Sequence, residues 1–267
     1  MGVYWTRRLV EGTSDGALIA ELLSLGRERS LVYRETFVDA IGHANPAVRA
    51  MAIRALGWLR SQAVVGDLIS CLDDIDPGVR RWTAASLALT GTAQSGTHLI
   101  ARLRIEDNDV ARSAIIRTLG WLQVKSAISA ITDALTCDDS GDVRAQAISA
   151  LVKLEAVYTA PLWVRALTDP CASVRCQALR ALAGCPELSL QSELAVLMTD
   201  TDPEVRLLAL RTMTDRRTPG IEKQCMEGLE DENPGVRVTA LICLRKLEGV
   251  DALSRIMNLC ADPNPEV

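Results

Sequence analysis

Histidine is nearly absent from this 267-residue sequence, and aromatic residues make up only 3% of it. The two histidines, His43 and His98, lie far apart, and neither is followed by glutamate, so the sequence contains no His-Glu-x-x-His zinc motif. It also lacks a glycine-rich phosphate loop. We therefore expect a protein without catalytic residues, bound metal or cofactor.

Long apolar runs are missing as well. Arg, Asp or Glu interrupts the apolar stretches every few residues, whereas a membrane-spanning helix needs ~20 consecutive apolar residues. No basic and then apolar signal peptide begins the chain, so we expect a cytoplasmic protein that does not enter a membrane. The net charge of −5 disfavours nucleic acid as a partner unless the charges segregate to different faces.

The eight cysteines do not show the spacing of a metal site. Cys171, Cys176 and Cys185 lie within one short stretch, but their gaps match no Cys-x-x-Cys pair. Cys185 and Cys225 occupy sequence positions at which apolar core residues are expected. We interpret the cysteines as reduced thiols, several of which serve as small core residues.

A repeated Val-Arg pattern dominates what is present. The stretch 45-NPAVRAMAIRALGWLR-60 recurs as 108-NDVARSAIIRTLGWLQ-123, and shorter versions occur elsewhere. Taking the valine as position zero, the repeats are 31 or 32 residues apart. The zero positions are Val48, Val79, Ala111, Val143, Val174, Val205, Val236 and Val267. Such a period predicts a solenoid of stacked two-helix units.

Each repeat contains the signals of two helices. Apolar residues at positions zero, +4 and +8 form one helical stripe, and a second set falls at +20, +21 and +24. Asn, Asp or Ser stands three residues before position zero as a helix N-cap, commonly followed by proline. Cys171 takes the cap position in one repeat, where Asp-Pro comes two residues early. We expect a different turn there.

The pattern Asp-Pro-x-Val-Arg-x-x-Ala-x-x-x-Leu resembles the HEAT-like repeat of the phycobilisome-lyase type, and the resemblance covers nearly the whole chain. It implies an all-α, right-handed solenoid of about eight two-helix repeats, whose Val-Arg helices line the concave side. We expect a degenerate N-terminal cap helix over 1–30, repeats over 31–261, and the start of a truncated repeat over 262–267. With no helix after 250–261, the C-terminal end would be uncapped and open to self-association.

Arginine at +1 and an acid at −5 recur in successive repeats. The arginines are Arg49, Arg80, Arg112, Arg144, Arg175, Arg206 and Arg237. The acids are Asp74, Glu106, Asp138, Asp169, Asp200, Asp231 and Asp262. In resembling proteins such residues bind one another between successive turns, the arginine fork donating to carboxylate and backbone oxygens. We interpret them as a structural ladder, because an active site would not need a copy in every repeat.

The positions left for function are those that face outward from the Val-Arg helices, which we expect to be +2, +3, +6 and +10. Arginine and tryptophan are frequent there. The candidate partner-binding residues are Arg54, Trp58, Arg81, Trp82, Arg117, Trp121, Arg180 and Arg211. Both residue types are enriched at the energetic centres of protein interfaces. The alternative interpretation is that Trp58 and Trp121 cover an interhelix loop and that the arginines form a solvated face.

Three functions fit this sequence. We favour a non-catalytic scaffold that grips an acidic or mixed segment of a partner protein in its concave groove. The second is a phycobiliprotein-lyase-like subunit that acts with a second HEAT-like chain on a bilin and its acceptor protein, which a change in bilin colour would reveal. The third is a nucleic-acid binder similar to HEAT-like DNA glycosylases, which predicts a steep loss of duplex affinity with added salt.

Overall fold

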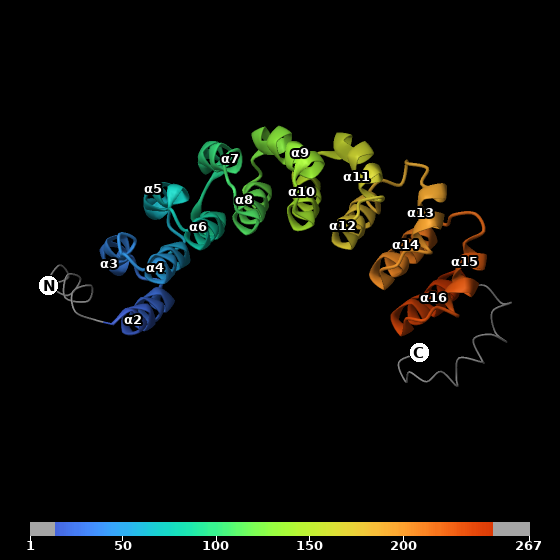
Figure 1. Cartoon of the computed structure of the whole chain (residues 1–267), viewed down its shortest axis with the longest axis horizontal. Helices are drawn as coiled ribbons and strands as arrows, with labels where there is room; N and C mark the ends of the chain where they lie inside the picture. The colour runs from blue at the N-terminus through green and yellow to red at the C-terminus, as the bar shows by residue number, and fades with distance from the viewer. Residues whose placement is uncertain (1–13, 248–267) are drawn as a thin grey trace. The chain divides into compact units, whose positions relative to one another are not determined.

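The computed structural model describes residues 14–247. The chain divides into two compact units, unit 1 up to Ala156 and unit 2 from Val157. The described residues form helices joined by short turns, with no β-strand among them (Figure 1). The predicted all-α repeat architecture is confirmed, whereas the sequence period gave no sign of the division into two units.

Unit 1 consists of two layers of helices (Figure 1). The inner helices are α2 (Asp15–Glu28), α4 (Pro46–Trp58), α6 (Pro77–Thr90), α8 (Asp109–Trp121) and α10 (Gly141–Lys153). The outer helices are α3 (Arg34–Ala40), α5 (Val65–Ser70), α7 (Gly96–Leu103) and α9 (Ile128–Cys137). Short 3-10 turns lead into or extend the outer helices: η1 (Leu31–Tyr33), η2 (Gln62–Val64), η3 (Cys71–Asp73), η4 (Ala93–Ser95) and η5 (Lys125–Ala127).

Unit 2 repeats the arrangement over its described residues, 157–247. Its Val-Arg helices are α12 (Ala172–Leu182), α14 (Pro203–Asp215) and α16 (Pro234–Lys246). Its second layer contains η6 (Val157–Thr159), α11 (Ala160–Ala166), α13 (Gln191–Leu197) and α15 (Ile221–Gly228). In both units, neighbouring Val-Arg helices pack on one another, and each also contacts the second-layer helix that precedes it in the chain.

The core lies between the layers and between successive repeats. Every position-zero residue among the described repeats, from Val48 to Val236, is fully buried. Ala52, Ala147, Ala178, Ala209 and Ala240 at +4 are fully buried too, and their small side chains let neighbouring helices approach closely. The repeat of α8 exchanges the sizes, with Ala111 at zero and Ile115 at +4. Such a swap keeps the volume of the core nearly constant.

The Val-Arg helices begin at the predicted caps. The side chains of Asn45, Asp76, Asn108, Asp202 and Asn233 accept hydrogen bonds from the first-turn backbone N–H groups. The expectation of a different turn at Cys171 is wrong: its φ and ψ are −88° and 121°, against −88° and 122° at Asn233. The Cys171 N–H donates to Asp169 Oδ1 at 2.9 Å. The ladder acid therefore maintains this turn without a capping side chain.

The cap helix was predicted over 1–30, of which residues 1–13 lie outside the described residues. The described part of this range contains α2, which begins after Ser14 and packs on α4. Gly26 of α2 lies against the Trp58 ring of α4, so a Cβ there would come within 2.9 Å of Trp58 Cε3. The expected truncated repeat over 262–267, its acid Asp262 and the uncapped surface over 250–261 lie outside the described residues. Within 14–247, no helix combines the length and apolarity that crossing a membrane requires.

Candidate interaction face

The ladder residues form bidentate pairs between successive repeats. The arginine at +1 donates through Nε and Nη2 to the acid at −5 of the next repeat. The Nε and Nη2 distances are 2.8 and 2.7 Å for Arg49–Asp74, 2.8 and 2.9 Å for Arg112–Asp138, 2.7 and 2.6 Å for Arg175–Asp200, and 2.8 and 2.7 Å for Arg206–Asp231. Their planar fork geometry matches the carboxylate.

The remaining guanidinium nitrogen ties each arginine to the turn before its own helix. Arg144 Nη1 donates to the carbonyls of Asp138 and Asp139 at 2.8 and 3.0 Å, and Arg237 Nη1 donates to the Asp231 carbonyl at 2.9 Å. The acid at −5 also accepts the backbone N–H of the cap residue, as Asp138 does from Ser140 at 2.9 Å. Links between an arginine's own turn and the next repeat are therefore made by Arg49, Arg80, Arg112, Arg175 and Arg206.

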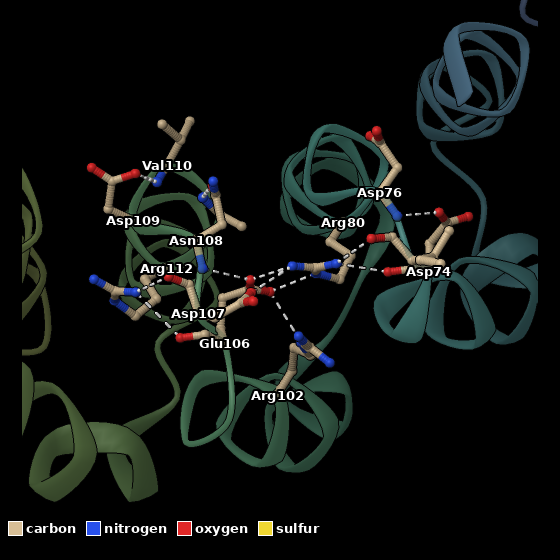
Figure 2. A network of polar contacts seen from close by, with 12 residues as sticks. Asp74, Asp76, Arg80, Arg102, Glu106, Asp107, Asn108, Asp109, Val110 and Arg112 are labelled. Atoms are coloured by element: carbon tan, nitrogen blue, oxygen red, sulfur yellow. Dashed lines mark hydrogen bonds and ion pairs between the residues drawn. The ribbon is translucent and has the colours of Figure 1, made fainter. Parts of the chain in front are cut away.

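Glu106 forms the most enclosed of these pairs (Figure 2). Its side chain is fully buried, and Arg80 Nη2 approaches Glu106 Oε1 within 2.5 Å. Arg102 of α7 donates to the other carboxylate oxygen at 3.0 Å. The repeat pattern does not predict this contact. Burial alone would raise the pKa of Glu106, but hydrogen bonds from Arg80, the Asn108 N–H and Arg102 outweigh it and lower the pKa to about 2.

Exposure of the Val-Arg helices differs from the expectation at one position. Residues at +2, +6 and +10 are mostly exposed or half-buried, whereas the residues at +3, all of which were expected to face outward, are a mixture of buried and half-buried side chains. Met51, Ala114 and Thr239 at +3 are only 5%, 3% and 7% exposed, and Trp82 is half-buried. At 3.6 residues per turn, +3 lies only about 60° around the helix from the buried position zero. Position +3 therefore lies at the border of the buried side of the helix.

Four candidate residues come together on α4 and α6. The Arg54 guanidinium carbon lies 4.4 Å from the ring centroid of Trp82 and 5.4 Å from that of Trp58. Arg81 lies 5.1 Å from the Trp82 centroid. Within residues 14–247, no carboxylate pairs with Arg54 or Arg81. Stacking on an aromatic ring orients a guanidinium while leaving the N–H donors at its edge available.

The next two inner helices of unit 1 continue this surface. Arg117 of α8 is exposed and precedes Trp121 by one turn, and the Trp121 side chain is 62% exposed. Lys153 of α10 places its Nζ 4.7 Å from the Trp121 ring centroid. Leu89, which holds the same +10 position on α6, is 46% exposed. The sequence analysis did not include Lys153 and Leu89 among the candidate partner-binding residues. Both stand at +10, the position of Trp58 and Trp121, and this register could have identified them.

We define the inner face as Trp82 together with the residues at +2, +6 and +10 of α4, α6, α8 and α10. Its +6 row contains Arg54, Ala85, Arg117 and Ser149, and its +10 row contains Trp58, Leu89, Trp121 and Lys153. Arg81 stands at +2. Positive charge predominates in these positions. The face therefore combines oriented cations with exposed aromatic and aliphatic side chains.

Two candidate arginines belong to unit 2. Arg180 of α12 donates to Glu204 of α14 at 2.9 Å, and both side chains are about half exposed. Arg180 and Glu204 border a hollow of about 290 Å³ together with Ser173, Cys176 and Gln177. Arg211 of α14 is exposed. The inner face defined on unit 1 therefore does not include Arg180 or Arg211.

The cysteines lie mostly in the cores of the two units. Cys185 and Cys225, which the sequence placed at core positions, are 2% and 0% exposed. Cys137 is exposed and Cys171 is partly exposed. Among residues 14–247, no group of three or more His, Cys, Asp or Glu side chains is arranged to hold a metal ion.

Several solved structures share this fold. The chain is 22% identical to Escherichia coli YibA, with 74% of this chain and 76% of that one covered and a TM-score of 0.61. It is 19% identical to the CpcE–CpcF complex of phycocyanin lyase from a Nostoc species, covering 89% and 92%, with a TM-score of 0.50. For Kap95p, solved in complex with RanGDP, the identity is 14%, the coverage is 98% and 44%, and the TM-score is 0.67. These likenesses establish the fold.

The family comparison accounts for most of the sequence. The model of HEAT repeats matches residues 34–120, 97–183 and 190–267. No curated protein matches the sequence. The matched repeats coincide with the stacked helix pairs and with the arginine–carboxylate ladder, and on this evidence the chain belongs to the HEAT-repeat family.

Proposed function

We propose that the chain is a non-catalytic scaffold that binds an acidic segment of a partner protein on the inner face of unit 1. The observation that carries the proposal is the stack of Arg54 and Arg81 on Trp82. These guanidinium groups are oriented by aromatic rings, and no carboxylate among the described residues neutralises them. Oriented donors bind a carboxylate with less loss of side-chain entropy than free ones.

The distribution of charge also supports this proposal. The chain carries a net charge of −5, yet Arg54, Arg81, Arg117 and Lys153 all stand on the inner face. Buried ladder arginines such as Arg175 are already paired with carboxylates. An acidic partner would therefore be attracted to this face in particular, and the attraction would weaken with added salt.

The state of the ladder supports a non-catalytic role. Hydrogen bonds lower the pKa of Glu106 to about 2, and they also lower the pKa values of Asp74 and Asp231 against the opposing effect of burial. Carboxylates held ionised in bidentate pairs are poor proton donors near neutral pH. Two proteins of the same fold were solved with protein partners, Kap95p with RanGDP and CpcE with CpcF.

Site-specific crosslinking in the native host tests the proposal. A photoreactive benzoylphenylalanine would replace Ala85, which lies half-buried in the +6 row between Arg54 and Arg117. The control would carry the same group at Ala101, an exposed position on the outer helix α7. Crosslinked products would be identified by mass spectrometry and compared at low and high salt.

We expect the Ala85 position to capture a protein through an acidic segment, with less product at high salt. The Ala101 position should capture little. Equal capture at both positions, or capture at Ala101 alone, would show that the inner face of unit 1 is not the binding surface. The bilin-binding, DNA-binding and self-association hypotheses and the cytoplasmic location remain predictions with their own tests.

A further inference from the structure

Apart from Trp82, on which Arg54 and Arg81 stack, the large apolar side chains of the inner face form a single row. Trp58 is half-buried, Leu89 is 46% exposed and Trp121 is 62% exposed, one in each successive repeat at +10. Their neighbours at +6 are Arg54, Ala85 and Arg117. An amphipathic helix has an apolar stripe about 100° wide that needs a broad hydrophobic groove. A row one side chain wide is too narrow to cover such a stripe.

The spacing of this row suits one backbone conformation. Packed helices lie ~8–10 Å apart, which sets the distance between successive +10 side chains. A polyproline II segment rises ~3.1 Å per residue with three residues per turn, so every third side chain faces the same way at intervals of ~9.3 Å. A β-strand instead repeats its faces about every 6.8 Å, and an α-helix turns every 5.4 Å. Polyproline II geometry therefore supplies one side chain per repeat.

The arginines of the inner face lie beside the +10 row, where they can contact a second face of a polyproline II segment. Position +6 is one helical turn from +10, about 6 Å along the helix axis. Arg54 and Arg117 hold this position in alternate repeats, and Arg81 at +2 stands in the repeat between them. Since the side chains of a polyproline II segment project in three directions, residues next to the apolar ones point toward these arginines.

We propose that the occupant of the inner face is an acidic, proline-containing segment in the polyproline II conformation. Its apolar side chains recur every third residue and contact Trp58, Leu89 and Trp121 in turn. Its carboxylates, at the next position of each triplet, bind Arg54, Arg81 and Arg117. This inference rests on the proposed function and specifies the conformation and sequence pattern of the partner segment.

Synthetic peptides bound to the full chain test the pattern. The probe is a fluorescently labelled peptide of four Leu-Glu-Pro triplets, followed by fluorescence anisotropy. One control has the same composition with the leucines grouped at one end, and another replaces every glutamate by lysine. A third is a proline-free, glutamate-rich helical peptide with leucines at heptad spacing. Binding is compared for the wild type, Trp121→Ala, Arg117→Glu and Arg104→Glu, the last altering an exposed arginine that follows α7 in the outer layer.

The triplet peptide should bind at least about tenfold more tightly than the grouped and lysine peptides. Trp121→Ala and Arg117→Glu should each weaken it at least about fivefold, and Arg104→Glu should leave it unchanged. Equal binding of the triplet and grouped peptides, or binding that ignores Trp121, overturns the polyproline II proposal. Tighter, Arg117-dependent binding of the heptad peptide also overturns it but preserves the proposed function. If no acidic peptide depends on Arg117 and Ala85 captures no protein, both proposals fail.

Discussion

At the residue scale, the surroundings of an arginine determine what it does. Arg175 and Arg180 lie on the same helix, α12, and both contact a carboxylate of the next repeat. The side chain of Arg175 is 11% exposed and its pair is bidentate, whereas the side chain of Arg180 is 48% exposed and donates a single hydrogen bond. The difference in burial makes these two residues a matched test of the ladder.

We expect Arg175→Ala to lower the free energy of unfolding by about 1–3 kcal/mol, because it leaves the part-buried Asp200 carboxylate without its arginine. Arg180→Ala should change it by less than about 1 kcal/mol, since exposed ion pairs contribute little. Urea unfolding followed by circular dichroism measures both. Equal effects of the two substitutions would remove the distinction between the ladder and the exposed pairs.

The second residue-scale prediction concerns Glu106 and acid. Its pKa is lowered to about 2 from an ordinary value of 4.5, so its stabilising effect is complete above about pH 4.5 and is lost as the pH falls toward 2. Glu106→Gln should be less stable than the wild type at pH 7. It should also lose less stability between pH 4.5 and 3, because it has no carboxylate to protonate.

Unfolding free energies of the two proteins at pH 7, 4.5 and 3 provide the comparison. Because Asp74 and Asp231 also have lowered pKa values, both proteins should weaken in acid, and the informative quantity is the difference between their slopes. Parallel curves for the wild type and Glu106→Gln would contradict the assignment of this carboxylate as ionised in the folded state.

At the scale of the elements, the sequence predicted where the helices lie and where they begin, but not the backbone conformation at their C-terminal ends. The apolar stripe and the Asn or Asp caps located the Val-Arg helices, because burial and capping act through residues a few positions apart. The left-handed residues after these helices carried no such signal. Arg60 and Gln123 take φ values of 49° and 55°, where glycine is usual. Their backbone N–H groups donate to the carbonyls of Gly57 and Gly120, and these local hydrogen bonds do not depend on the identity of the left-handed side chain, so the sequence carries no sign of them.

The same limit applies to contacts between repeats. The offsets of +1 and −5 predicted the arginine and acid ladder, since both residues recur in fixed register. The extra contact from Arg102 to Glu106 occurs in one repeat only, and no periodic signal could indicate it. Exposure at +3 varies from repeat to repeat, because this position lies at the border of the buried side of the helix, and the repeat pattern alone does not show which residues there are covered.

Close approach of successive inner helices yields an element-scale prediction. A Cβ on Gly57 of α4 would lie 2.6 Å from Ser86 Oγ and 3.0 Å from Ser86 Cα on α6. Ser86 is buried, and its hydroxyl donates to the Ile53 carbonyl at 3.0 Å, which restricts its movement. Gly57→Ala should therefore destabilise the protein by about 1–3 kcal/mol, despite the intrinsic gain of up to ~1 kcal/mol for alanine in a helix.

Gly16 of α2 provides the matched control, because a Cβ there would meet nothing within 4 Å. Gly16→Ala should leave the melting temperature unchanged or raise it slightly. Thermal unfolding of the two variants decides the question. A higher melting temperature for Gly57→Ala would show that α4 and α6 are not held at this close separation.

At the scale of the whole molecule, the uniform repeat period gave no indication that the chain divides into two compact units. Val143 and Val174 are 31 residues apart, as in most other repeats, yet the compact units separate at Ala156. Each unit has its own buried residues, such as Leu87 in unit 1 and Leu210 in unit 2. Sequence periodicity reports the length of a repeat and not the compactness of a group of repeats. It therefore did not show that Arg54 and Arg117 belong to one unit and Arg180 and Arg211 to the other.

The central claim is that an acidic partner binds the inner face of unit 1, and the most direct test is the affinity of the protein captured through Ala85. Arg81→Glu with Arg117→Glu reverses two exposed charges of the face. Arg104→Glu with Arg165→Glu makes the same charge change at exposed positions elsewhere. We predict at least about a tenfold loss of affinity for the first pair, no loss for the second, and wild-type melting temperatures for both. Full affinity after reversal of Arg81 and Arg117, with the fold intact, would contradict the account.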